Sequence, residues 1–179
     1  ISGIIESPNS CKLEFNDQYN LLYMHMARLN LDQSLDTPKD SLIKFNVNIA
    51  NAYKAASGVN YLSEYLSDTL INNSIREFYN ENQLKLTNPG ILESKIKSKT
   101  TENLDWFFND FIKTRKNIDF KFNEVHKNGD SLTIQLRNKT GILVPIPIYG
   151  MQGDSIVSKS WVKGFKKEKE ISISAENID

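Results

Sequence analysis

The spacing of apolar residues along the chain changes at about Ile118, from three or four residues to two. Before this point apolar side chains recur at the steps of amphipathic helices, and after it they alternate with polar residues as in half-buried strands. The change predicts an α+β chain. We expect an N-terminal α-helical bundle or bowl over residues 1–117, followed by a small antiparallel β-sandwich-like module over residues 118–179.

The longest helical pattern runs from about Asn46 to Leu66. Its predicted apolar stripe consists of Phe45, Ile49, Ala52, Tyr53, Ala56, Val59, Leu62 and Leu66. Gly58 lies within this pattern, where the lack of a side chain would let another helix approach closely. Shorter helices are expected from Asp17, from Thr37 as N-cap, after Asp68, around Leu92 to Ile96, and from Thr101 as N-cap.

The second part of the chain reads as five short strands separated by turn residues. Asn128-Gly129-Asp130 and Gln152-Gly153-Asp154 are expected to be hairpin turns. The strand predicted over Ile142–Tyr149 contains Pro145 and Pro147, which remove two backbone donors, so we expect it at a sheet edge.

Composition excludes several classes of protein. The 22 basic and 22 acidic residues balance, which argues against nucleic acid as a partner, because phosphate neutralisation needs an excess of Lys and Arg. No apolar run approaches the roughly 18 residues of a membrane span. Cys11 is the single cysteine, and His25 and His126 have no second ligand at metal-binding spacing, so we assign no metal. The first residue is Ile1, which we take to indicate a processed or excised chain.

Several short segments, taken in order, carry a resemblance. In the helical part they are Leu31-Asp32-Gln33-Ser34-Leu35, Tyr53 to Leu62, Glu64-Tyr65-Leu66-Ser67-Asp68, Asn88-Pro89 and Asn103-Leu104-Asp105-Trp106-Phe107-Phe108. They resemble the D-Q-P-L, Tyr-x-Lys, E-x-L-G-D, H-P and D-L-x-W-F-F motifs of aminopeptidase-N-type zinc metallopeptidases, the family that includes leukotriene hydrolase.

The β-part is similar to the bacterial branch of the same family. The matching segments are Ile118-Asp119-Phe120-Lys121, Arg137 to Gly141, Pro145-Ile146-Pro147 and Trp161 to Phe165. The resemblance covers about residues 30–165, and its most specific piece is the Trp-Phe-Phe segment. It implies that the chain is a C-terminal fragment of a zinc aminopeptidase, forming the helical wall of the substrate groove and an adjoining β-module.

In that family a zinc ion polarises the substrate carbonyl and activates water, and the Glu of His-Glu-x-x-His is the general base. Those residues precede the matched region, so the resemblance implies that zinc belongs to the parent protein and that this chain holds no cofactor. Its implied partners are the N-terminal catalytic portion of the same polypeptide and a peptide substrate. The isolated chain is expected to be inactive, and export to the periplasm or cell envelope is implied by the bacterial relatives.

Tyr53 is the candidate catalytic residue within the chain, as the hydroxyl that stabilises the tetrahedral oxyanion. The family spacing is Tyr-x-Lys, which counts back from Lys54 to Ala52, whereas Tyr53 directly precedes Lys54. One residue turns a helical side chain by about 100°, so either a local shift restores Tyr53 or the hydroxyl has been lost. Ser67 and Asn88 also replace the family's Gly and His.

Two other functions stay open from the sequence. A peptidase-like module without catalysis would bind peptides or act as a structural scaffold. An unrelated helical-plus-sandwich binding protein is the third interpretation. A His-Glu-x-x-His upstream of Ile1 would favour the enzyme, and its absence would favour the module without catalysis.

Overall fold

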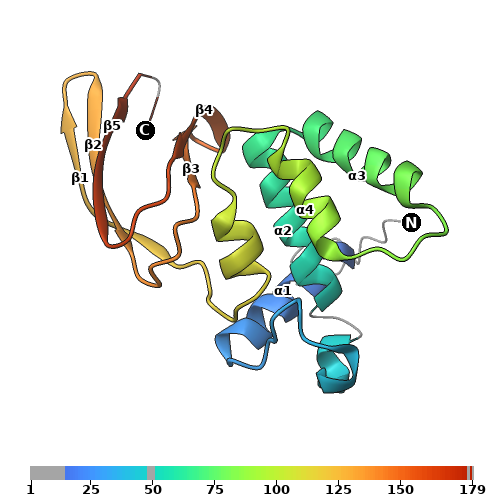
Figure 1. Cartoon of the computed structure of the whole chain (residues 1–179). Helices are drawn as coiled ribbons and strands as arrows, with labels where there is room; N and C mark the ends of the chain where they lie inside the picture. The colour runs from blue at the N-terminus through green and yellow to red at the C-terminus, as the bar shows by residue number, and fades with distance from the viewer. Residues whose placement is uncertain (1–14, 48–50, 177, 179) are drawn as a thin grey trace. The chain divides into compact units, whose positions relative to one another are not determined.

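The computed structural model describes residues 15–47, 51–176 and 178, and the chain divides into two compact units, Ile1–Arg115 and Lys116–Asp179. The first unit holds the helices and the second holds two antiparallel sheets (Figure 1). This order confirms the expected α+β class. No helix in the described ranges combines the length and apolar character needed to cross a membrane.

The helical unit is organised around its third element. In chain order the elements are α1 (Phe15–Arg28), the 3₁₀ turn η1 (Lys39–Ser41), α2 (Asn51–Leu66), α3 (Asp68–Asn82), α4 (Pro89–Lys97) and the π-helical turn η3 (Trp106–Phe111). Helix α2 contacts α1, α3 and η3, and α4 packs on α3. The position of α2 therefore determines how the other helices of this unit can pack.

The buried face of α2 differs from the predicted apolar stripe. Its buried residues are Lys54, Gly58 and Leu62, which recur every four residues and so share one face. Residues of the predicted stripe that are exposed instead are Phe45, Ala52, Ala56 and Val59, and Ile49 lies outside the described residues. Leu62 belongs to the predicted stripe, and Gly58 lies on the inner face as its expected role in close packing requires. The predicted face is wrong because it does not include Lys54, a residue type that is rarely buried unless it is paired.

Two predicted helix caps are also wrong. The hydroxyl of Thr37 forms a hydrogen bond with that of Ser34, at 2.9 Å, and the short helix begins after Pro38. Thr101 is exposed, while Thr100 Oγ1 accepts the Glu102 amide and Asn103 Oδ1 accepts the Asp105 amide, each from two residues further along the chain.

The last helical segment, Trp106–Phe111, therefore begins later than the helix predicted from Thr101, and it is a π-helical turn rather than an α-helix. The backbone amide of Ile112 donates to the carbonyl of Phe107 at 3.0 Å, a five-residue step typical of a π-helical turn. This turn buries Trp106, which is 5% exposed.

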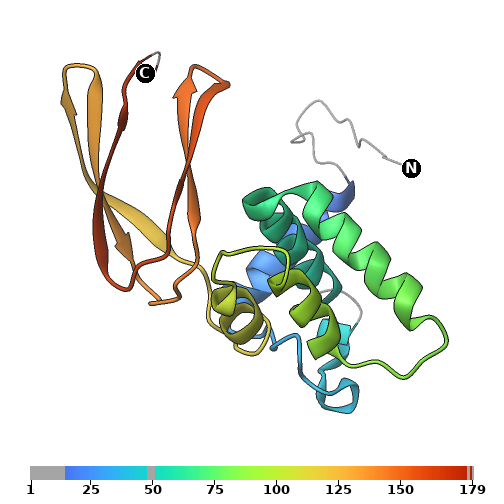
Figure 2. The ribbon, with the colours of Figure 1, turned by 45° about the horizontal axis from the view of Figure 1, so that its top comes forward.

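The β-unit contains the five expected strands. They are β1 (Phe120–Asn128), β2 (Ser131–Asn138), β3 (Ile146–Gln152), β4 (Ser155–Val162) and β5 (Glu168–Ser174). One sheet has the order β1-β2-β5 and the other pairs β3 with β4, and every pairing is antiparallel (Figure 2). Buried residues come from both sheets: Ile134, Leu136, Ile146, Ile148 and Val162.

The predicted proline-containing strand is shorter than expected. It begins at Ile146 rather than at Ile142, and Pro147 lies opposite Trp161 of β4. Within the described residues β3 pairs with β4 alone, so its other edge can tolerate a missing donor, as expected from the two prolines.

Both hairpins close through the same two-residue loop, a glycine followed by an aspartate. Gly129 and Gly153 have φ angles of +56° each, a left-handed conformation that glycine adopts without a steric penalty. A glycine at the first loop position suits the tight turns whose twist matches antiparallel strands. The sequence therefore predicts both turns correctly.

A buried asparagine fastens the loops of the β-unit. Asn138 is 6% exposed, and its Nδ2 donates to the carbonyls of Ile142 at 2.8 Å and Phe165 at 2.6 Å. Its Oδ1 accepts the backbone amides of Thr140 at 3.1 Å and Gly141 at 2.9 Å. One side chain thus satisfies backbone groups from two connections that lie apart in the sequence.

Replacing Asn138 by Ala is expected to destabilise the β-unit by at least about 2 kcal/mol, because buried carbonyls and amides would lose their partners. Hydrogen exchange followed by mass spectrometry on the full chain would show faster exchange in β2 and around Phe165. The matched control is Asn128→Ala, at the exposed end of β1, which should leave the exchange unchanged. Equal exchange in both variants would contradict this role of Asn138.

Candidate functional site

The first turns of α2 carry Tyr53, the candidate catalytic residue, and its neighbours Ala52 and Lys54, which belong to the segment that resembles the family's Tyr-x-Lys motif. Tyr53 is partly buried and Ala52 is exposed, while Lys54 is buried. Adjacent residues on a helix point about 100° apart, so the inward direction of Lys54 sets the direction of both neighbours.

Lys54 forms a buried ion pair with Asp32. Its Nζ lies 3.1 Å from Asp32 Oδ2 and also donates to the backbone carbonyl of Gln33 at 3.2 Å. The two side chains are 3% and 2% exposed. Removing two charges from water is costly, and the cost is offset only when the charges are paired and further hydrogen bonds complete their shells. Lys54 meets this condition, because its ammonium group is paired with the Asp32 carboxylate and also donates to the Gln33 carbonyl.

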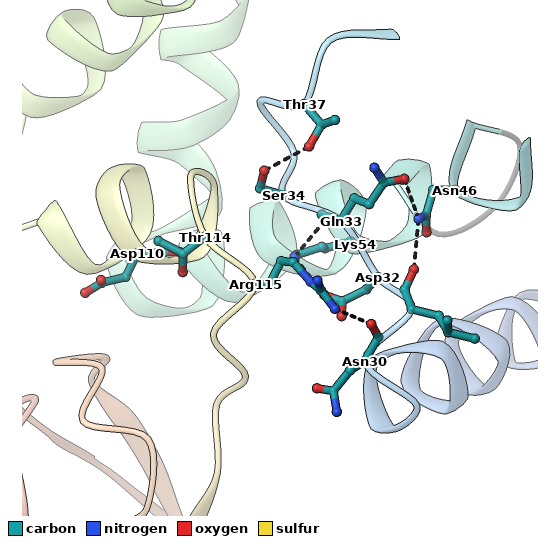
Figure 3. A network of polar contacts seen from close by, with 11 residues as sticks. Asn30, Asp32, Gln33, Ser34, Thr37, Asn46, Lys54, Asp110, Thr114 and Arg115 are labelled. Carbon is teal, nitrogen blue, oxygen red and sulfur yellow. Dashed lines mark hydrogen bonds and ion pairs between the residues drawn. The ribbon is translucent and has the colours of Figure 1, made fainter. Parts of the chain in front are cut away.

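The segment of residues 30–35 is irregular and is held by polar contacts from three directions (Figure 3). Asn46 Nδ2 donates to the Leu31 carbonyl at 3.0 Å and to Gln33 Oε1 at 2.9 Å. The Leu35 amide donates to the Ile112 carbonyl at 2.9 Å, and Arg115 donates to the carbonyl of Asn30. These bonds satisfy backbone groups that no helix or sheet supplies with partners.

The ring of Phe111 packs against the inner face of α2. A Cβ atom on Gly58 would lie 2.3 Å from Cε1 of this ring, so the contact requires glycine. The same ring lies 5.8 Å from Lys54 Nζ, within the range of a cation–π interaction. The buried lysine and the glycine one turn later therefore meet the same aromatic side chain.

A second aromatic cluster surrounds Trp106. Tyr61 and Tyr65 of α2 meet its ring edge to face, with centroids 5.9 Å and 6.3 Å away. The Tyr65 hydroxyl donates to Glu102 Oε2 at 2.6 Å, and burial together with this hydrogen bond raises the pKa of Tyr65. The cluster fastens the second half of α2 to the Trp-Phe-Phe segment.

Three buried side-chain polar atoms of this unit find no hydrogen-bond partner within residues 15–47 and 51–176. They are Nε1 of Trp106, Oδ1 of Asn46 and Oδ1 of Asn51, the first residue of α2. Buried polar atoms are normally satisfied by protein or water, so all three are places where a further partner would be favourable.

The part of the chain that the structure describes offers no metal centre. No three His, Cys, Asp or Glu side chains in it lie close enough together to hold a metal ion. His25 and His126 are both exposed and belong to different units, and His126 lies 3.2 Å from Glu124. The residues present therefore do not fit a zinc ion. Cys11 lies outside the described residues.

Sequence reasoning quoted Asp32 and Lys54 as parts of two motifs but missed that they are partners. A signal was available: Lys54 lies four and eight residues before Gly58 and Leu62, on one helical face. Asn46 and Arg115 carry no comparable signal, because their partners lie in a remote part of the chain: the carbonyls of Leu31 and Asn30 and, for Asn46, also Gln33 Oε1.

Comparison with known proteins adds no relative: no protein-family model, no curated protein and no solved structure matches the chain.

Replacing Lys54 by Met is expected to cost about 3–5 kcal/mol of unfolding free energy, because Asp32 would stay buried without a counter-charge. The double variant Asp32→Leu with Lys54→Met should be more stable than either single variant. Urea titration followed by Trp106 fluorescence, in a Trp161→Phe background, reports on the helical unit.

The control for Lys54 is Lys97→Met, which removes more exposed ion pairs with Glu93 and Asp105 and should change stability much less. An equal loss in Lys97→Met and Lys54→Met, or no recovery in the double variant, would argue against the buried pair as the main polar constraint.

Tyr23 should make the helical unit sensitive to alkali. Burial, reinforced by the negative charge of Asp32, raises the pKa of Tyr23 from 10.0 to about 12. A folded-state pKa above the unfolded value stabilises the fold fully below pH 10.0, and this contribution falls as the pH rises towards 12. Tyr23→Phe should remove this part of the alkaline destabilisation, while Tyr79→Phe, at a side chain that is 66% exposed, should not. Urea titrations between these pH values, with tyrosinate absorbance as a second readout, would check it.

Proposed function

We propose that the chain is the C-terminal part of a zinc aminopeptidase-like protein, which supplies the helical wall of a peptide-binding groove and an adjoining β-module. In this proposal the metal site belongs to an upstream portion of the same polypeptide. Zinc and the general base then come from that upstream portion, and this chain contributes shape, substrate contacts and the candidate oxyanion donor Tyr53.

The observation that supports the proposal is the packing of the segments that resemble the family. The D-Q-P-L-like segment meets the Tyr-Lys helix through Asp32 and Lys54. The Trp-Phe-Phe segment meets the same helix through Trp106 against Tyr61 and Tyr65, and its next turn does so through Phe111 at Gly58. The segments that resemble the family, although remote from one another in the sequence, thus pack together around α2. Such packing is expected if the chain keeps the family's helical fold.

Tyr53 would act as a hydrogen-bond donor to the oxyanion of the tetrahedral intermediate. Lys54 points inward, so Tyr53 lies about 100° away from it around α2, and in this proposal the Tyr53 hydroxyl takes the role that the family's Tyr-x-Lys spacing would give to position 52. Ser67, which stands where the family has Gly, is compatible with a divergent member of the family. Its hydroxyl accepts the Leu70 amide at 3.1 Å and so caps the N-terminus of α3.

The chain by itself is expected to bind no stoichiometric zinc and to release no product from aminoacyl anilides. Metal analysis and a chromogenic anilide assay on the 179-residue chain check this. Clear turnover by the chain alone would overturn the proposal.

The decisive experiment repeats the assay on a longer polypeptide, in which this chain is joined to its natural upstream sequence. That longer polypeptide should contain His-Glu-x-x-His, hydrolyse aminoacyl anilides and lose activity with a chelator. In it, Tyr53→Phe should lower kcat by about 100- to 1000-fold, the effect of removing one oxyanion donor, while Tyr79→Phe leaves kcat unchanged. An upstream sequence without the motif would favour the module without catalysis.

A further inference from the structure

The tip of the first hairpin holds the chain's one asparagine that is followed by glycine, Asn128-Gly129. Strand β1 ends at Asn128, which pairs with Ser131 at the start of β2, and Gly129 and Asp130 form the loop. The Asn128 side chain is exposed and forms no hydrogen bond with another described residue.

We propose that Asn128 is a site of spontaneous deamidation and backbone isomerisation. The backbone nitrogen of Gly129 loses its proton to hydroxide and attacks Cγ of Asn128. The bond from Cγ to Nδ2 then breaks, and Nδ2 takes up a proton from water and leaves as ammonia. The product is a five-membered succinimide. Water then adds to one of the two ring carbonyl carbons and breaks its bond to the ring nitrogen, which gives aspartate when Cγ is released and isoaspartate when the backbone carbonyl carbon is released. Water and hydroxide are the only reactants besides the chain.

The fold leaves this position accessible to the reaction. Glycine has no Cβ, so nothing shields the attacking nitrogen, and its backbone adopts rotations that other residues avoid. Within the described residues β1 pairs with β2 alone, and the Asn128–Ser131 pair is the last of that ladder. The loop is also held by the Ala175 amide, which donates to the Asp130 carbonyl at 2.8 Å, and Ser131 pairs with Ser174 of β5. Local opening of the Asn128 end of β1 still costs less than global unfolding, so the nitrogen can reach Cγ without loss of the core.

The second hairpin provides an internal comparison. Its loop, Gly153-Asp154, has the same residues and the same glycine φ of +56°, but Gln152 occupies the place of Asn128. Glutamine has one more methylene, so attack by the glycine nitrogen would close a six-membered ring, which forms much more slowly. Asn138 is protected differently, because its amide is buried and makes four hydrogen bonds to backbone groups.

Deamidation would change both charge and register at this tip. The formal charge of the chain is zero, so one new carboxylate makes it net negative and places that charge two residues before Asp130. Isoaspartate also routes the backbone through the former side chain, which adds one atom to the main chain. The Asn128–Ser131 pairing is then lost, and the loop no longer suits a tight hairpin turn.

The test incubates the full folded chain in mildly alkaline buffer and follows every asparagine and glutamine by peptide mapping with mass spectrometry. Methylation by an isoaspartyl methyltransferase detects the isomerised product. We expect loss of ammonia at Asn128 before any other described residue, with Gln152 intact and with isoaspartate formed. Asn128→Gln should abolish the signal.

The variant Gln152→Asn transfers the reactive pair to the second hairpin and should create a second site there. The proposal is overturned if Asn128 in the folded chain stays intact while the urea-unfolded chain reacts, or if Asn128 reacts no faster than Asn138. Deamidation that continues undiminished elsewhere in the first hairpin of Asn128→Gln would also overturn it.

Discussion

The helical unit depends on one buried charge pair, Lys54 with Asp32. The two side chains are almost fully removed from water, and neither could stay there alone. Because Lys54 belongs to the central helix and Asp32 to an irregular segment, the pair fixes the rotation of α2 and the path of residues 30–35 together. The hydrogen bonds of Asn46, Gln33 and the Leu35 amide follow from that path.

The inner face of α2 extends this constraint into aromatic packing. Gly58 leaves space for the Phe111 ring, which also meets the ammonium group of Lys54. The π-helical turn of residues 106–111 is what brings both Trp106 and Phe111 to the same helix. The β-unit uses a similar device in Asn138, whose amide replaces missing backbone partners in two loops. In both units a buried polar side chain holds irregular backbone in place.

The same arrangement bears on the proposed function. Among the residues of α2 that resemble the peptidase family, Lys54, Gly58 and Leu62 are buried and pack the helix, and Tyr53 is the proposed oxyanion donor. Its position follows from Lys54, since one residue along a helix turns the side chain by about 100°. The buried pair therefore also sets the direction of the hydroxyl proposed as the oxyanion donor. The described residues contain no group of three His, Cys, Asp or Glu side chains that could hold a metal ion.

The sequence by itself determined the order of helices and strands, the change of period near Ile118 and both glycine-aspartate turns. These features depend on the local spacing of apolar residues and on the ability of glycine to adopt positive φ. Both are properties of residues close together in the sequence, so they need no tertiary contacts. Tertiary structure decided which face of α2 is buried, where the 106–111 turn begins and which polar groups pair. A lysine becomes an inner residue only when a remote carboxylate compensates its charge, and periodicity contains no information about that partner.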